Sequence, residues 1–110
     1  MACGCVLVAA DAIGSTPYLI KNGITGLSFR SSRTSCSFDN PDKKALDSLY
    51  ENVKWLLDNP VEMDKIRSRS IKQMQELYNP QTAAERLLVL IDCLQKGSAP
   101  GFSDGPCSKA

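Results

Sequence analysis

The N-terminal quarter of the chain restricts the fold more than any other feature. Residues 5–10 read Cys-Val-Leu-Val-Ala-Ala, an unbroken apolar run with the length of a strand that is buried on both faces. Asp11, Gly14 and Ser15 supply loop residues directly after it. Strands buried on both faces belong to α/β proteins, in which ligands bind beyond the carboxyl ends of the strands. We therefore expect an α/β fold, with the 11–15 loop as the first place to look for a ligand.

A short helix and a second strand are expected to follow this loop. Residues 16–20 permit one helical turn, with Ser15 or Thr16 as the N-cap and Pro17 near the first helical position. Asn22-Gly23 is a turn signal. A second strand is then predicted at 27–29.

The second half of the chain carries three Asn-Pro dipeptides, at 40–41, 59–60 and 79–80. Each places a capping asparagine before a proline at the first helical position. Glu62 follows Asn59 at the spacing of a capping box. These signals predict three consecutive helices, at 41–58, 60–78 and 80–96. Their apolar registers differ, which argues against a solenoid repeat.

Two of these helices carry surfaces that could bind a ligand or another chain. On the second helix, Lys65, Arg69 and Lys72 share one face, which is either solvated or in contact with an anionic carrier or a phosphate. On the third helix the apolar surface is wider than one stripe, so we expect it to pack on two sides. Helix 80–96 would then either fold back on its own domain or pair with another chain.

Composition narrows the function classes. A chain of 110 residues with a net charge of +1 makes one small domain and lacks the strong positive charge of nucleic-acid-binding proteins. No window approaches the roughly 20 apolar residues of a membrane span, and no basic segment opens a signal peptide. We expect a cytoplasmic protein with no nucleic-acid partner and no membrane span. The glycine- and serine-rich segment 97–110 predicts a flexible tail, either disordered or loosely laid on the surface.

Histidine is absent and five cysteines are present, at 3, 5, 36, 93 and 107. Without histidine, Ser-His-Asp and Cys-His catalysis are excluded. The Cys3-Gly-Cys5 triplet could be half of a zinc site, but no second close cysteine pair completes it. We therefore expect ordinary thiols and no metal. Asp11 is the only acid in the first 38 residues, and serves either as a loop cap or as a ligand-facing group.

The order of these motifs resembles glycosyltransferase family 4, whose members have the GT-B fold. Met1, Ala2 and Gly4 match the Met-Ala-x-Gly stretch at the end of a helix in that family, and the apolar run matches the buried strand that follows. Gly14 and Ser15 match a Gly-Gly or Gly-Ser loop. The subsequent Asn-Gly-x-x-Gly turn is matched by Asn22, Gly23 and Gly26. Less specifically, the resemblance continues through the three helices to about residue 96.

The resemblance implies a fragment of the Rossmann-like, C-terminal donor domain, with short parallel strands followed by three helices. It divides the chain into a strand-loop-helix-strand part at 1–40, a three-helix segment at 41–96 and a tail at 97–110. The parent enzyme would transfer a sugar from a nucleotide-sugar to a glycan or lipid-linked acceptor, with retention of configuration. It would use no separate cofactor. The donor-cleft candidates are Asp11, Gly14, Ser15 and Thr16, and no catalytic residue is assigned.

The departures from the family limit what this chain does by itself. The two glutamates that bind the donor would precede Met1, as would the N-terminal lobe, and Tyr18 stands where many members have a glutamate. We therefore expect this chain to be inactive in isolation. The alternative is a small non-catalytic α/β module that binds a partner, or a second copy, through helix 80–96.

Overall fold

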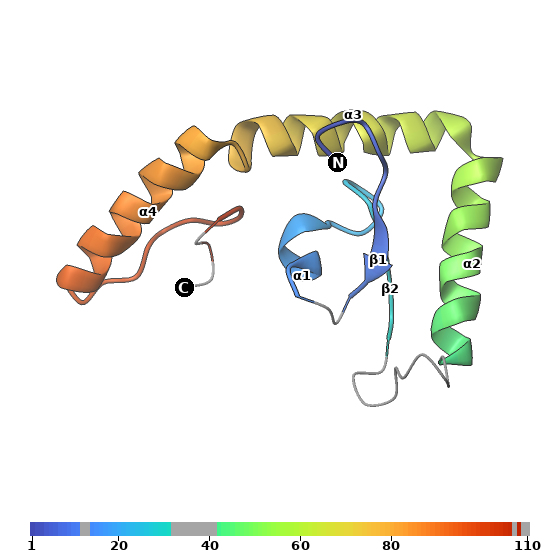
Figure 1. Cartoon of the computed structure of the whole chain (residues 1–110), viewed down its shortest axis with the longest axis horizontal. Coiled ribbons are helices and arrows are strands. Elements are labelled where there is room, and N and C mark those ends of the chain that lie inside the picture. The colour runs from blue at the N-terminus through green and yellow to red at the C-terminus, as the bar shows by residue number, and fades with distance from the viewer. Residues whose placement is uncertain (12–13, 32–41, 107, 109–110) are drawn as a thin grey trace. The chain divides into compact units, whose positions relative to one another are not determined.

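The computed structural model describes residues 1–11, 14–31, 42–106 and 108 and contains two short strands and four helices (Figure 1). It divides into two compact units, with the boundary between Ile71 and Lys72. The expected α/β class is confirmed. The division into segments 1–40, 41–96 and 97–110 stays a prediction. The elements are β1 (Val8–Ala10), α1 (Thr16–Leu19), β2 (Leu27–Phe29), α2 (Lys43–Asp58), α3 (Pro60–Leu77) and α4 (Pro80–Gln95).

β1 and β2 form a parallel pair in which Val8 lies opposite Leu27 and Ala10 opposite Phe29. The prediction of the second strand is confirmed at its full length. The first strand is shorter than the run at 5–10, because β2 offers only three residues to pair with. The expected burial on both faces was wrong for most of the run: Ala10 is buried, whereas Cys5 is exposed.

The connection from β1 to β2 contains the predicted helical turn and the predicted Asn22-Gly23 turn. Ser15 occupies the N-cap position of α1, and a proline follows within the first two helical residues. In the turn, the Ile24 N–H donates to the Lys21 carbonyl at 2.9 Å. The buried Thr25 hydroxyl accepts a hydrogen bond from the Lys21 N–H at 3.0 Å. These bonds close the turn that leads from α1 to β2.

Gly26 is required where the chain enters β2. The N–H of Leu27 donates to the Leu7 carbonyl oxygen at 2.9 Å. A Cβ atom added to Gly26 would lie 2.8 Å from that same oxygen and 3.3 Å from Cγ2 of Ile20. The two chain segments therefore approach more closely than any residue with a side chain permits.

α2 begins two residues later than predicted. Its N-cap is Asp42, whose carboxylate accepts from the Lys44 N–H at 3.0 Å, so the helix starts at Lys43 and not at 41. Asn40 lies outside the described residues. The aspartate directly after the Asn-Pro pair supplies the same capping oxygen as asparagine, and here it fixes the start.

The core of the first unit lies where α2 and α3 meet the strands. Asn52 of α2 donates to the Ser28 carbonyl of β2 at 3.3 Å, and α2 contacts both strands. The most deeply buried member is Ile66 of α3, with 1% of its surface exposed. The buried cluster comprises Leu27, Leu56 and Ile66, with Val6, Val8 and Met63 packed against it.

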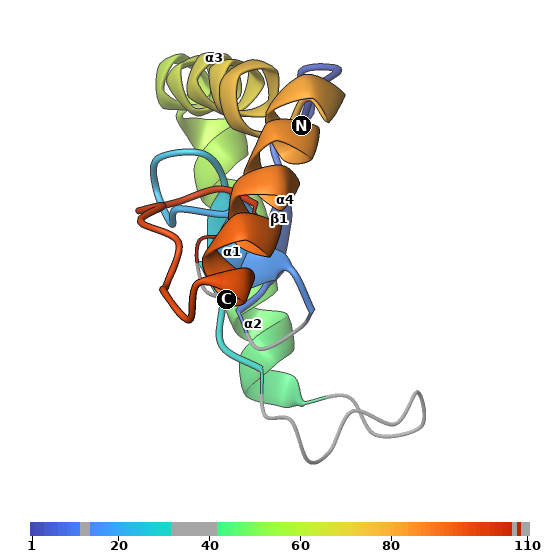
Figure 2. The same ribbon diagram turned by 90° about the vertical axis from the view of Figure 1, so that its left-hand side faces the viewer.

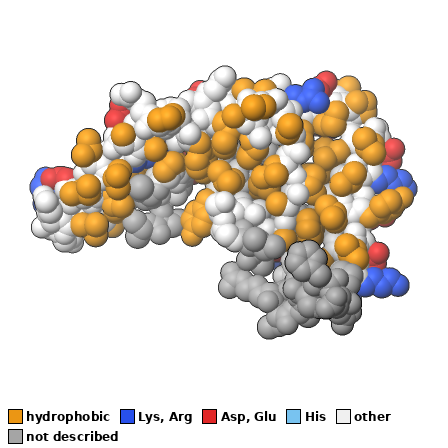
Figure 3. Space-filling view, in the orientation of Figure 1, with side chains coloured by type: hydrophobic (Ala, Val, Ile, Leu, Met, Phe, Trp, Pro, Cys, Tyr) orange, Lys and Arg blue, Asp and Glu red, His pale blue; other side chains and the backbone are white. Residues whose placement is uncertain are grey.

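α2 carries a stripe of apolar side chains, and only part of this stripe is buried. Leu56 is buried and Leu49 is half-buried, whereas Leu46, Tyr50 and Leu57 are exposed by 48%, 64% and 73%. Hydrophobic side chains accordingly gather on the visible surface over α2 (Figure 3). The stripe consists of two adjacent rows, and two three-residue strands cover only one of them.

α3 begins at Pro60, as predicted, but its cap differs from the expected capping box. The Asn59 side-chain amide donates back to the Trp55 carbonyl at 2.8 Å, at the end of α2. Glu62 instead bonds Lys65. Ser70 of α3 is fully buried, and its hydroxyl donates to the Arg67 carbonyl at 2.9 Å. Hydrophobic periodicity does not predict that this serine is buried, because serine counts as polar. Its hydroxyl can be buried without cost when it bonds a carbonyl of its own helix.

The second unit contains α4, capped as predicted by Asn79. The Asn79 carboxamide oxygen accepts from the Thr82 N–H at 2.8 Å. After α4 the chain turns and runs back alongside the helix in both ribbon views (Figures 1 and 2). Arg86 of α4 donates to the carbonyl oxygens of Asp104 and Pro106, and its guanidinium carbon lies 4.6 Å from the centre of the Phe102 ring. Of the two alternatives for the tail, the described part is laid on the surface.

Candidate functional site

The carboxyl ends of β1 and β2 form one edge of the sheet, because the two strands are parallel. Asp11 follows β1 at this edge and is half-buried. Its N–H donates to the Phe29 carbonyl at 2.9 Å, and its carboxylate accepts from the Ser31 N–H at 3.4 Å. Asp11 thus ties the two strand ends together. This geometry favours the loop-cap role for Asp11 over a ligand-facing one.

The other three donor-cleft candidates lie in the loop between β1 and α1. Gly14 has φ +48°, and no atom lies within 4 Å of the position that a Cβ would take. Ser15 is exposed, and its side chain makes no capping hydrogen bond. Its carbonyl oxygen accepts from the N–H groups of Tyr18 and Leu19, both at 3.0 Å. The Ser15 hydroxyl is thus accessible to a ligand at the edge of the sheet.

Thr16 is half-buried, and its carbonyl oxygen accepts from the Ile20 N–H at 2.9 Å. The structure therefore places Asp11, Gly14, Ser15 and Thr16 after one strand, with Ser31 as a neighbour that sequence patterns did not suggest. Residues 12 and 13, between Asp11 and Gly14, lie outside the described part. Only the register of the parallel pair would have predicted that Ser31 lies at this edge.

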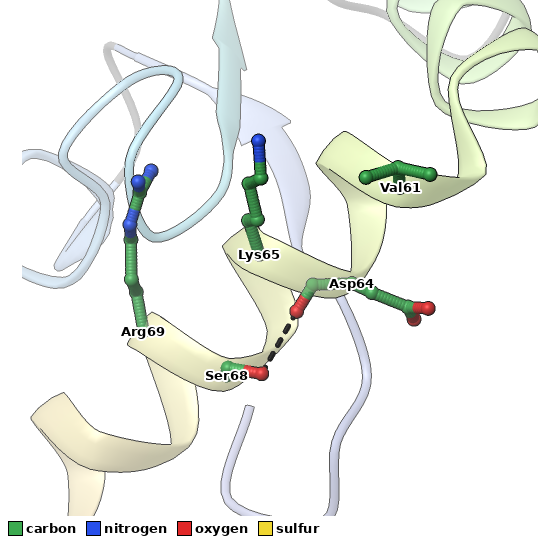
Figure 4. A pocket seen from close by; sticks show the side chains of 5 residues that line it. All are labelled: Val61, Asp64, Lys65, Ser68 and Arg69. Atoms are coloured by element: carbon green, nitrogen blue, oxygen red, sulfur yellow. Dashed lines mark hydrogen bonds between the residues drawn. The ribbon is translucent and has the colours of Figure 1, made fainter.

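A shallow depression lies on the face of α3 that carries the predicted basic residues. It is lined by Val61, Asp64, Lys65, Ser68 and Arg69. Figure 4 shows Lys65 and Arg69 extending from the same side of the helix, with the Ser68 hydroxyl bonded to the Asp64 carbonyl. All five residues come from one helix, so the depression has no opposing wall of its own.

Most of the positive charge on this face is already paired. Lys65 lies 2.6 Å from a Glu62 carboxylate oxygen, and Lys72 lies 3.8 Å from a Glu76 oxygen. Arg69 is exposed and has no ion pair within the described ranges. Exposed pairs of this kind contribute little energy and leave little net field. The pairing favours the solvated alternative over an anion-binding one.

Neither a metal centre nor a membrane span was found in the part of the chain that the structure describes. No group of three or more histidine, cysteine, aspartate or glutamate side chains is close enough there to hold a metal ion. No helix among those residues is long and apolar enough to cross a bilayer. Cys3 and Cys5 are exposed, Cys93 is half-buried, and all three are free thiols. Cys36 and Cys107 lie outside the described residues.

α4 presents the second surface that could bind a partner. Leu87, Leu88, Ile91 and Leu94 are exposed by 52%, 68%, 45% and 69%. The sequence predicted a wide apolar surface here, but the expectation of packing on two sides is not met within the second unit, since no α4 residue is fully buried.

Two surfaces are therefore candidates for binding a ligand or a partner: the edge of the sheet and the apolar face of α4. Comparison with other proteins adds no further guide: no known protein family, no curated protein and no solved structure matches this chain.

Proposed function

We propose that this chain is part of a glycosyltransferase of the GT-B type, in which the edge of the β1–β2 sheet forms one wall of the nucleotide-sugar site. The observation that carries the proposal is the parallel pair of strands with an open Gly-Ser loop at its carboxyl edge. Parallel α/β sheets bind nucleotides at this edge. The resemblance to family 4 supports the same location and implies transfer with retention of configuration.

Within this proposal Gly14 and Ser15 have different roles. Gly14 lets a diphosphate approach the backbone, since no atom occupies the space beside its Cα. The exposed Ser15 hydroxyl donates a hydrogen bond to a phosphate or sugar oxygen. Asp11, which follows β1, holds the loop in place through its two hydrogen bonds to the end of β2. Gly14 and Ser15 position a donor and supply no acid or base, so the chain is expected to bind weakly and not to catalyse transfer in isolation.

Titration of the ¹⁵N-labelled chain with uridine and guanosine diphosphates, followed by NMR, tests this proposal. We expect the amide signals of Gly14, Ser15 and Thr16 to shift at millimolar nucleotide. Gly14→Val should abolish these shifts, because φ +48° and the approach of a diphosphate both require glycine. Gly97→Val is the matched control, since Gly97 also has positive φ and open surroundings. Unshifted loop signals at ten millimolar nucleotide would refute a donor site on this chain.

The exposed apolar face of α4 favours a second candidate function, the binding of a partner helix or a second copy. Four large apolar side chains, each at least 45% exposed, occupy one half of a single helix. Exposed apolar surface of this kind commonly marks an interaction site. This function would need no nucleotide and no residue of the 11–16 loop.

Analytical ultracentrifugation over a hundredfold concentration range tests self-association through α4. We expect the weight-average mass to rise with concentration and Leu88→Glu/Leu94→Glu to abolish the rise. Leu57→Glu on α2 is the control, because Leu57 is similarly exposed but lies on another helix. A wild-type chain that stays monomeric throughout would eliminate pairing of two copies.

A further inference from the structure

The two cysteines at the N-terminus lie on either side of a bend. The N–H of Gly4 donates to the Met1 carbonyl at 3.0 Å, which closes a turn over residues 1–4. The chain bends at Gly4, which has φ +84°. Cys3 and Cys5 flank this bend, and both are exposed as free thiols. Neither thiol is therefore buried in the core.

Cysteines two positions apart can come within the range of a disulfide when the chain between them bends. Two consecutive Cα–Cα steps of about 3.8 Å reach about 7 Å in an extended chain and less in a bent one. A disulfide needs Cα atoms about 4.4–6.8 Å apart. The left-handed conformation that produces this bend is accessible to glycine and costly for residues with a Cβ. Gly4 thus provides the geometry that a ring closed by Cys3 and Cys5 requires.

The bend is also anchored, and its anchor carries positive charge. A Cβ on Gly4 would lie 3.7 Å from Cδ of Arg67 and 3.9 Å from Cδ1 of Ile71, so Gly4 packs against α3 at van der Waals distance. Nη1 of Arg67 bonds the Asp64 carboxylate at 2.7 Å. Nε, one bond from Cδ, is buried and has no hydrogen-bond partner in the described structure. The Arg67 side chain therefore lies against the bend that separates the two cysteines.

We propose that Cys3 and Cys5 form a dithiol site that exchanges with small-molecule disulfides such as glutathione disulfide. The thiolate of one cysteine attacks a sulfur of glutathione disulfide and forms a mixed disulfide, and one glutathione leaves as its thiolate and takes up a proton. The second cysteine loses its proton, attacks the protein sulfur of the mixed disulfide and releases the second glutathione. The dithiol is oxidised by two electrons, and glutathione disulfide is reduced to two glutathione molecules. This inference is independent of the proposed sugar-transfer role.

A tryptic peptide isolates this chemistry from the other cysteines. The first lysine or arginine of the chain is Lys21, so the peptide 1–21 contains Cys3 and Cys5 and no other cysteine. The intact chain is incubated with glutathione disulfide, its remaining thiols are alkylated at low pH, and the digest is analysed by mass spectrometry. We expect peptide 1–21 to lose two hydrogen atoms without retaining glutathione, and excess reduced glutathione to restore the dithiol.

Single substitutions distinguish ring closure from simple glutathionylation. In Cys3→Ser and Cys5→Ser, the remaining thiol should retain glutathione, because no second thiol displaces it. Gly4→Val should lower the yield of the ring about tenfold, since valine resists the left-handed conformation. Gly23→Val is the matched control, because Gly23 also has positive φ and lies away from both thiols in sequence. A wild-type peptide that stays reduced, or that retains glutathione as the single variants do, would overturn the proposal.

Discussion

The close approach of backbone at Gly26 gives the sharpest test of the fold. In Gly26→Ala, the new methyl carbon would lie 2.8 Å from the Leu7 carbonyl oxygen and 3.3 and 3.4 Å from two side-chain carbons of Ile20. The oxygen cannot move away freely, because it accepts the Leu27 N–H at 2.9 Å at the entry to β2. Relief of the clash must therefore separate residues 7 and 27 and weaken the pairing of the strands.

The magnitude follows from two opposing terms. Overpacking of a filled site costs about 1–3 kcal/mol. Replacement of glycine by alanine lowers the conformational entropy of the unfolded chain, which stabilises the folded state by about 0.4–1 kcal/mol. We expect Gly26→Ala to lower the free energy of unfolding of the first unit by about 1–2 kcal/mol, which raises the unfolding constant about tenfold.

Urea unfolding followed by the fluorescence of Trp55 measures this change in the first unit. Trp55 is the only tryptophan and lies on α2, which contacts both strands. With a urea dependence of about 1–3 kcal/mol per molar, the midpoint should fall by roughly 0.3–2 M. Gly101→Ala, at a glycine with nothing within 4 Å, is the control and should leave the midpoint unchanged. A Gly26→Ala chain as stable as wild type would refute the close approach.

Two further substitutions test the core and the return of the tail. Ile66→Ala should lower the free energy of unfolding by about 2–5 kcal/mol, because Ile66 is 1% exposed. The control is Leu57→Ala, at a residue that is 73% exposed. It should change the free energy of unfolding by less than about 0.5 kcal/mol in the same urea titration. Gly105→Ala should speed hydrogen exchange in the tail, because its Cβ would lie 2.8 Å from Nη1 of Arg86 and the residue has φ +83°. Gly97→Ala has positive φ in open surroundings, so equal effects of the two glycine substitutions would show that the contact with Arg86 does not hold the tail.

Local chemistry explains which elements were predictable. The Asn79-Pro80 pair fixes the start of α4 because the asparagine oxygen and the proline ring act within one helical turn. The strand at Leu27–Phe29 was found at its full length because turn residues precede it. By contrast, α2 starts at Lys43 because Asp42, and not an earlier residue, supplies the capping oxygen. Several adjacent residues could cap this helix, so the sequence pattern did not single one out.

The candidate site was predictable in position but not in detail. The rule that ligands bind beyond the carboxyl ends of parallel strands pointed to the loop at 11–15. It did not indicate that the Asp11 carboxylate bonds the Ser31 N–H, because that contact joins residues far apart in the chain. The exposure of Cys5 was likewise missed, since its place in an apolar run predicted burial.

The sequence by itself determined the order of the elements and the three long helices, because caps, turns and apolar runs act over a few residues. Tertiary structure decided which surfaces are covered. Leu56 is buried and Leu57 exposed although both are leucines of one helix, because only one row of α2 faces the strands. Gly26 is required not for its own conformation but for the Leu7 carbonyl that lies against it. Such choices depend on neighbours distant in sequence, and no local pattern records them.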